Sequence, residues 1–76
     1  MSSATDHRTE AINLIVNGTA TTSTAATLAA LLAEVGYGDS KVATARNGEF
    51  VPQRQRASTL LTDGDQIEIV APRQGG

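Results

Sequence analysis

Residues 63–76 read DGDQIEIVAPRQGG and carry the clearest structural signal in the chain. The stretch opens on an Asp-Gly-Asp turn, since these residue types favour tight turns. Ile67 and Ile69 then alternate with Glu68 and Val70, which is the two-residue period of a half-buried β-strand. The stretch closes on two glycines, and an end without side chains can enter a narrow channel in a partner protein. A frayed terminus would look the same, so the glycines alone leave both interpretations open.

A second alternating strand starts at Ile12 and continues through Leu14 and Val16. The Asn-Gly pair at 17–18 favours a two-residue hairpin, because a type I′ turn needs positive φ at both central positions. The Thr-rich residues 19–24 should pair back on this strand. Their weak pattern predicts a strand at the edge of the sheet.

The middle of the chain predicts one helix. Its apolar residues recur every three or four positions and form one stripe; they are Leu28, Leu31, Leu32 and Val35. Alanines fill most of the remaining positions, and alanine is the best helix former. The hydroxyl of Thr24 or Thr27 could cap the N-terminus, and Gly36 suits the left-handed position that follows many helices.

Two short strands should follow the helix. Residues 41–46 alternate the small Ala43 and Ala45 with larger neighbours, so we expect the alanines to lie beneath the helix. A second Asn-Gly pair at 47–48 predicts another tight hairpin. Pro52 should end the returning strand, because it has no N–H to donate to a ladder.

A polar loop is expected between this hairpin and the last strand. Residues 53–58 are polar, and Arg54 and Arg56 are most simply in solvent. Leu60 and Leu61 should then bring the chain back to the core.

These elements predict an α+β fold. The order strand, strand, helix, strand, short strand, strand fits a mixed four- to five-stranded sheet with one main helix packed on one face. The first and last strands would lie side by side at its centre, flanked by the two hairpins. We expect a flexible polar leader at 1–10, one domain at 11–71 and a flexible C-terminal tail at 72–76.

The composition argues against several kinds of function. Without cysteine there is neither a disulfide nor a thiolate metal site, and the single histidine, His7, falls in the leader. Asp63 and Asp65 flank a glycine, which turn chemistry explains without a metal. Six basic and eight acidic residues are scattered singly, and no long apolar run occurs, so we expect neither nucleic-acid nor membrane binding. We therefore expect a cytoplasmic protein with no catalytic residues, metal or bound cofactor.

The uncovered face of the sheet is the candidate binding surface. If the isoleucines of the last strand point into the core, their neighbours point outward. The residues expected on this face are Ile15, Thr44, Arg46, Glu68 and Val70. Apolar patches of this size also occur on proteins that bind nothing there. We favour partner binding because the same face leads into the Gly-Gly tail.

Several motifs, in their order along the chain, resemble those of the ThiS family, the small ubiquitin-like sulfur carriers of thiamine biosynthesis. They are Val16-Asn17-Gly18, Thr27-Leu28 with Leu31-Leu32, ARNGEFVP at 45–52, Leu61, DGDQIEIV at 63–70 and Gln74-Gly75-Gly76. The resemblance runs from about Ile12 to the end of the chain. It implies the β-grasp (ubiquitin-like) fold, in agreement with the order of elements above.

The resemblance also implies a chemistry. In the family the terminal carboxylate, here that of Gly76, is adenylated with ATP by an E1-like adenylyltransferase of the ThiF type. It is then converted to a thiocarboxylate with sulfur from a donor protein, and the sulfur passes to a thiazole synthase of the ThiG type. The carrier would be a monomer when free and a co-substrate rather than an enzyme. Its residues Arg73, Gln74 and Gly75 would thread into the partners, and only the activating partner would use ATP.

Two alternatives stay open. Pro72 is also similar to the Pro-bearing tail of MoaD, the small subunit of molybdopterin synthase, which shares the fold and the activation chemistry. A ubiquitin-like modifier or interaction module would also end in Gly-Gly. The Val51-Pro52 step favours the ThiS family over MoaD. Thr44 and Arg46 stand where relatives usually carry apolar residues, so the partner enzymes would differ correspondingly.

Overall fold

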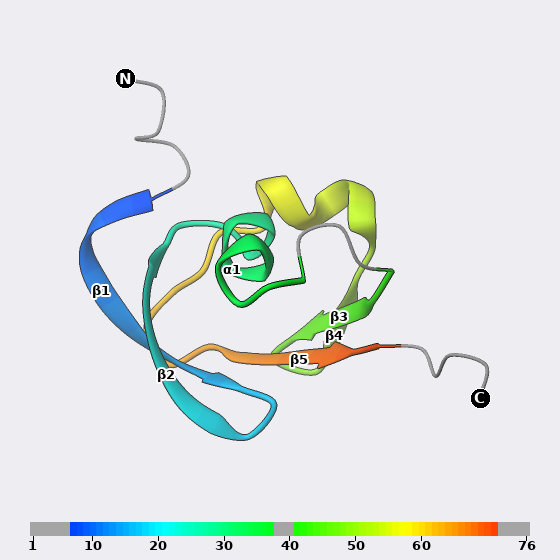
Figure 1. Cartoon of the computed structure of the whole chain (residues 1–76), viewed down its shortest axis with the longest axis horizontal. Coiled ribbons are helices and arrows are strands. Elements are labelled where there is room, and N and C mark those ends of the chain that lie inside the picture. The colour runs from blue at the N-terminus through cyan, green and yellow to red at the C-terminus, as the bar shows by residue number, and fades with distance from the viewer. Residues whose placement is uncertain (1–6, 38–40, 72–76) are drawn as a thin grey trace.

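The computed structural model describes residues 7–37 and 41–71. The elements in chain order are β1 (His7–Val16), β2 (Thr19–Ala25), α1 (Leu28–Glu34), β3 (Ala43–Arg46), β4 (Glu49–Val51), the 3₁₀ helix η2 (Gln53–Ser58) and β5 (Gln66–Val70). Both helices lie on the same side of the sheet (Figure 1). Neither helix in the described part of the chain is long and apolar enough to span a membrane.

The five strands form one mixed sheet in the order β2-β1-β5-β3-β4. The first and last strands, β1 and β5, pair in parallel at its centre, and all other neighbours are antiparallel. β2, the partner of β1 in the first hairpin, lies at one edge of the sheet, and the β3–β4 hairpin lies on the other side of β5. The predicted α+β arrangement is therefore confirmed.

Both predicted hairpin turns have the expected backbone geometry. Asn17 and Gly18 have φ of 51° and 81°, and Asn47 and Gly48 have φ of 52° and 86°. Two successive positive φ angles are the mark of a type I′ turn, whose twist matches that of the strands it joins. The turns pair Val16 with Thr19 and Arg46 with Glu49, so the sequence sets the register of both hairpins locally.

The helix α1 begins at the second of the two predicted caps. The hydroxyl of Thr27 accepts a hydrogen bond from the Ala30 N–H at 3.2 Å, and Gly36 has φ of 96° just after the helix. The three leucines of α1 are buried with Leu14, Ile67 and other apolar residues in a single core. Val35, the fourth member of the predicted stripe, is exposed, because the helix ends one residue before it.

The N-terminal part of the prediction is wrong for residues 7–10. We expected order to begin at Ile12, but β1 begins at His7. Of the extra residues, His7 pairs through its backbone with Ala25, and residues 8–11 form an irregular segment of the strand opposite Thr24 alone. Backbone pairing needs no alternating side chains, so the sequence pattern carries no signal for it. Residues 1–6 of the predicted leader, like the predicted tail at 72–76, lie outside the described residues.

The side-chain phase predicted for β3 is also wrong. Thr44 is only 2% exposed and faces the core, whereas Ala43 is exposed. The Thr44 hydroxyl donates to the Val51 carbonyl at 2.9 Å and accepts from the Arg56 guanidinium at 3.1 Å. Because its hydrogen bonds are satisfied, Thr44 can be buried where a bare hydroxyl would be costly.

Arg56 is also buried. The prediction that it lies in solvent is therefore wrong. Arg56 lies in η2, a 3₁₀ helix in place of the expected loop, and also donates to the Val42 carbonyl at 2.5 Å. Of the two leucines expected in the core, Leu61 is buried and Leu60 is exposed.

Candidate functional site

The uncovered face of the sheet is defined by the strand register. Directly opposite residues of neighbouring strands share a face, and on this face Ala45 lies opposite both Glu68 and Phe50, and Ala43 lies opposite Val70. Phe50 and Val70 are 69% and 63% exposed. We call Ala43, Ala45, Phe50 and Val70 the open-face patch. The two small alanines between the two large apolar side chains make it a shallow apolar surface beside the acidic Glu68.

The structure brings three of the five predicted face residues together. Glu68 and Val70 lie on the outer side of β5, and Ile15 lies on the same side of β1, opposite Gln66, with 39% exposure. Thr44 and Arg46 do not belong to this face, because β3 directs them toward the helix side. The structure therefore contradicts the prediction for these two residues.

Phe50 and the two alanines were missed from the predicted face. The Asn-Gly turn held the signal, because a two-residue loop places Thr44 opposite Val51 and Ala45 opposite Phe50. Val51 is apolar and buried, and Pro52 after it leaves the sheet. Thr44 lies opposite Val51 and must therefore point to the same inward face. Counting residues back from the Asn-Gly turn shows which side chains of β3 point inward. The alternation of Ala, Thr and Arg along β3 does not show this by itself.

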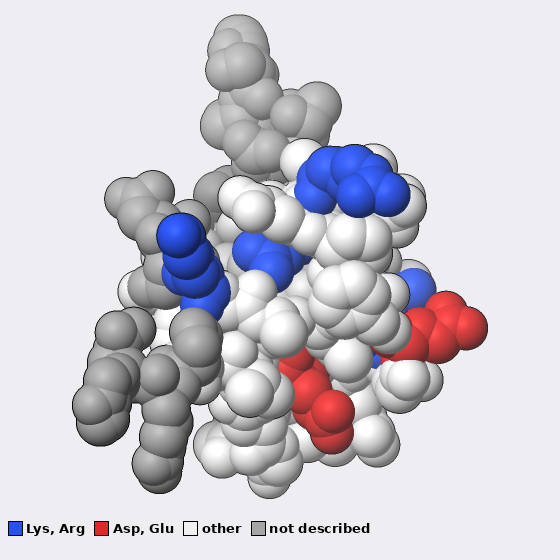
Figure 2. Space-filling view, turned by 90° about the vertical axis from the view of Figure 1, so that its right-hand side faces the viewer, with Lys and Arg blue, Asp and Glu red and all other residues white. Residues whose placement is uncertain are grey.

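Charge on the side of the molecule that Figure 2 shows is sparse and mixed. The basic side chains on this side lie apart from one another, and the few acidic side chains do not cluster (Figure 2). A surface of this kind offers no extended field for a polyanion. The open-face patch itself is apolar, with Glu68 beside it, so contact there would depend mainly on apolar burial.

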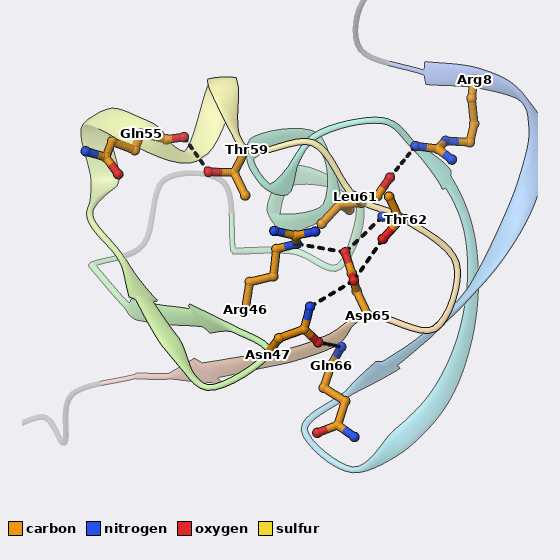
Figure 3. A network of polar contacts seen from close by, with 9 residues as sticks. All are labelled: Arg8, Arg46, Asn47, Gln55, Thr59, Leu61, Thr62, Asp65 and Gln66. Carbon is orange, nitrogen blue, oxygen red and sulfur yellow. Dashed lines mark hydrogen bonds and ion pairs between the residues drawn. The ribbon is translucent and has the colours of Figure 1, made fainter.

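Arg46 instead joins a polar network that sequence analysis missed. Its Nε donates to Asp65 Oδ2 at 2.8 Å, and the same carboxylate accepts from Asn47 Nδ2 at 3.0 Å. The backbone N–H and hydroxyl of Thr62 complete the set at 2.8 and 3.0 Å. Figure 3 shows these donors converging on Asp65 from the end of β3, from the β3–β4 turn and from the segment before β5.

The network holds Asp65 in its charged form. Burial of this side chain, which is 4% exposed, would raise its pKa. The hydrogen bonds from Arg46, Thr62 and Asn47 outweigh burial and lower the pKa from 3.8 to about 2. A carboxylate with every donor supplied by its own chain is structural, as the turn interpretation of Asp-Gly-Asp implied. Among the described residues, no group of three His, Asp or Glu side chains could hold a metal ion.

The comparison with known proteins places this geometry in a family. The sequence matches the ThiS family over residues 14–76, which is most of the chain. The chain belongs to the ThiS family. It is similar to the crystal structure of the thiamine biosynthesis protein (ThiS) from Geobacter metallireducens, with a TM-score of 0.72 and 29% sequence identity. That match covers 86% of this chain and 100% of the other, so the β-grasp fold expected from the resemblance is confirmed.

A curated relative differs in length from this ThiS-family chain. The protein named thiazole synthase from Paramagnetospirillum magneticum is 42% identical over 66 residues, which are 86% of this chain and 20% of that protein. This chain thus spans about a fifth of the length of that relative. A ThiS-like segment and the thiazole synthase name therefore occur together in one polypeptide.

The predicted sulfur-carrying end of this ThiS-family chain follows β5. The last pair of β5 with β3 is Val70 with Ala43, and Ala71 is the last described residue. The predicted roles fall on Arg73, Gln74, Gly75 and Gly76, all outside the described residues. These roles stay predictions.

Proposed function

We propose that this ThiS-family protein is a sulfur carrier for synthesis of the thiamine thiazole, with the sulfur carried on Gly76. The observation that carries the proposal is the family match, which runs through residue 76 and so includes Gly75 and Gly76. The central strand β5, held on both edges, leads directly toward this segment. A rigid base followed by a segment that ends in two residues without side chains suits delivery of a carboxylate to a separate active site.

The proposed chemistry begins with activation. A carboxylate oxygen of Gly76 attacks the α-phosphorus of ATP, and pyrophosphate leaves. Hydrosulfide released by the donor protein then attacks the acyl carbon of the adenylate, AMP leaves, the proton on sulfur is lost to solvent, and a thiocarboxylate remains. The carrier is a co-substrate in both steps, and its partners supply the catalytic groups and hold the ATP.

The proposed partners are an E1-like adenylyltransferase of the ThiF type, a sulfur donor protein and a thiazole synthase of the ThiG type, all in the cytoplasm. The P. magneticum relative supports the last of these, since its ThiS-like segment belongs to a chain named thiazole synthase. We propose the open-face patch, with Ile15 and Glu68, as the docking surface, and residues 73–75 as the segment that threads into the partners. The family match favours this pathway over the MoaD and modifier alternatives.

A thiol-selective alkylator tests the proposal directly. Intact mass alone is ambiguous, because exchange of oxygen for sulfur adds nearly the same mass as oxidation of Met1. The chain has no cysteine, so in protein isolated from thiamine-starved cells the reagent should label only a C-terminal thiocarboxylate. We expect one label, mapped to Gly76, and none on a variant lacking Gly75 and Gly76. An unlabelled wild-type chain with its tail intact would overturn the sulfur-carrier proposal.

A further inference from the structure

Asn17 makes a contact that its place in a hairpin turn does not require. Its side-chain Oδ1 accepts from the Ile69 N–H at 2.8 Å, and its Nδ2 donates to the Ile69 carbonyl at 3.2 Å. Both backbone polar groups of one β5 residue are thus bonded to a single side chain 52 positions away.

The contact extends the β1–β5 ladder by one step beyond the end of β1. The backbone N–H of Asn17 donates to the Ile67 carbonyl at 2.8 Å, and the strand register ends at the pair Val16 with Ile67. The backbone of Asn17 then turns away with φ of 51°, so it cannot reach Ile69. The amide side chain takes the place of the missing strand residue, because it presents one donor and one acceptor side by side.

The contact lies at the end of β5 that leads to the C-terminus. Ile69 is seven positions before Gly76 in the sequence. On the other edge of β5, Asn47 makes the corresponding contact at the opposite end of the strand. Its Oδ1 accepts from the Gln66 N–H at 2.9 Å, and its own N–H donates to the Gln66 carbonyl at 2.7 Å. The two turn asparagines therefore hold the two ends of β5. Of the two, Asn17 lies at the end that precedes the carrier segment, on the edge opposite the β3 pairs of Ile69 and Val70.

We propose that Asn17 is a positioning residue for sulfur loading: it fixes the direction in which the chain leaves β5, and so the placement of the Gly76 carboxylate in the activating enzyme. This inference rests on the proposed function. Asn17 lies outside the open-face patch. Its substitution therefore tests the direction of the C-terminal segment without changing the proposed docking surface.

The size of the loss in activity shows whether a variant has lost the exit direction of the chain or has only a longer free segment. Without the Asn17 amide, the last contact of β5 with β1 moves back to Ile67, while Ala43 of β3 still pairs with Val70. Even if β3 also released this end, loop closure over nine residues instead of seven would lower the local concentration of the terminus by only about 1.5-fold. A misdirected reactive group can cost up to about 100-fold. A loss beyond about 1.5-fold therefore reports lost direction, since tether length alone accounts for no more.

The test compares N17G and N17D with N47G in the full chain. Glycine tolerates the positive φ and removes the whole side chain. Aspartate keeps the acceptor for the Ile69 N–H but has no donor for the carbonyl. N47G is the matched control, because it removes the same side chain from the same turn type at the far end of β5. Hydrogen exchange of the Ile69 amide should be slowest in the wild type, intermediate in N17D and fastest in N17G, with N47G close to wild type at this amide.

The functional readout is steady-state adenylation by an E1-like ThiF-type enzyme at saturating ATP, with the carrier varied. N17G should lower kcat by more than about 1.5-fold, the tether limit, with KM nearly unchanged. A partly unfolded carrier would instead raise the apparent KM and leave kcat unchanged, since it only reduces the concentration of competent substrate. N47G should keep the wild-type kcat.

Each result decides one of the two proposals. If kcat of N17G stays within the tether limit, or N47G loses as much, the positioning role of Asn17 is wrong while the sulfur-carrier function stands. If the wild-type chain is not adenylated at all, the proposed function fails and the role of Asn17 in it fails too. The exchange rates of Ile69 then still report whether Asn17 holds β5.

Discussion

Asp65 shows how a single side chain can join parts of the molecule that are distant in sequence. Its carboxylate accepts hydrogen bonds from a side chain of β3, from a side-chain amide of the β3–β4 turn, and from the backbone N–H and hydroxyl of Thr62. Asn47 links this network to β5, because its Oδ1 accepts a hydrogen bond from the Gln66 N–H. The start of β5 is therefore fixed by a charged group whose hydrogen bonds satisfy its buried oxygens.

The lowered pKa of Asp65 predicts an acid-sensitive part of the stability. The carboxylate is stabilised in the folded state, so its contribution is complete above about pH 4 and is lost as the pH falls through about 2. A shift of this size corresponds to about 2 kcal/mol. Urea unfolding of the wild type and D65N at neutral pH should show D65N to be less stable by at least about that amount. The difference between the two proteins should shrink as the pH falls toward 2, and a constant difference would contradict the ionised network.

At the scale of elements, the helix depends on its cap and on one buried edge of leucines. Thr27 satisfies a free N–H at the start of α1, and Leu28, Leu31 and Leu32 face the sheet. Seven residues are too few for a stable isolated helix, so packing on the sheet holds α1 in place. Val35 follows the same spacing in sequence and lies outside the helix.

Two truncations in this stripe should therefore differ. Leu31→Ala removes a fully buried side chain and should lower the free energy of unfolding by about 2–5 kcal/mol. Val35→Ala, which removes an exposed valine of the same sequence stripe, should cost about 0.5 kcal/mol or less. Chemical denaturation of both variants with unchanged m-values would measure this. Equal losses would show that the helix packs through a different face.

At the scale of the whole molecule, the sheet divides a structural side from an exposed side. The helix side holds the core and the networks of Asp65 and Arg56, while the outer side exposes Phe50, Val70 and Ile15. Substitution of a side chain exposed on the outer side should change the stability little, because such a side chain makes few core contacts. This division should let the proposed docking and the stability be changed independently.

The substitution Phe50→Ser should weaken the proposed docking with little change in the stability. Phe50 is 69% exposed, so the substitution should change the stability by about 0.5 kcal/mol or less. Loss of an apolar anchor of about 1.4 kcal/mol would raise KM for the carrier in adenylation about tenfold. The control is Leu60→Ser, since Leu60 is 64% exposed and lies outside the sheet's open face. If Leu60→Ser raises KM as much, docking does not use the open-face patch.

Much of the architecture was predictable because its signals are local. The two Asn-Gly turns, the alternation in β1 and β5, the cap at Thr27 and the glycine after α1 each constrain a few neighbouring residues. Together they predicted the order of strands and their pairing. For the site, the same signals placed Ile15, Glu68 and Val70 on the outer face, and the motif order pointed to the ThiS family.

The sequence by itself thus determined the fold class, the hairpins and the family, because turn chemistry and side-chain period act over a few residues. Only the tertiary structure decided that His7–Glu10 extend β1, that Thr44 and Arg56 are buried, and that Asp65 is a hub. Each of these depends on partners far along the chain: a backbone edge in β2, a carbonyl in β4, and a guanidinium in β3. Whether a polar side chain is buried is decided by whether such a partner meets its hydrogen bonds, and only the folded chain brings the two together.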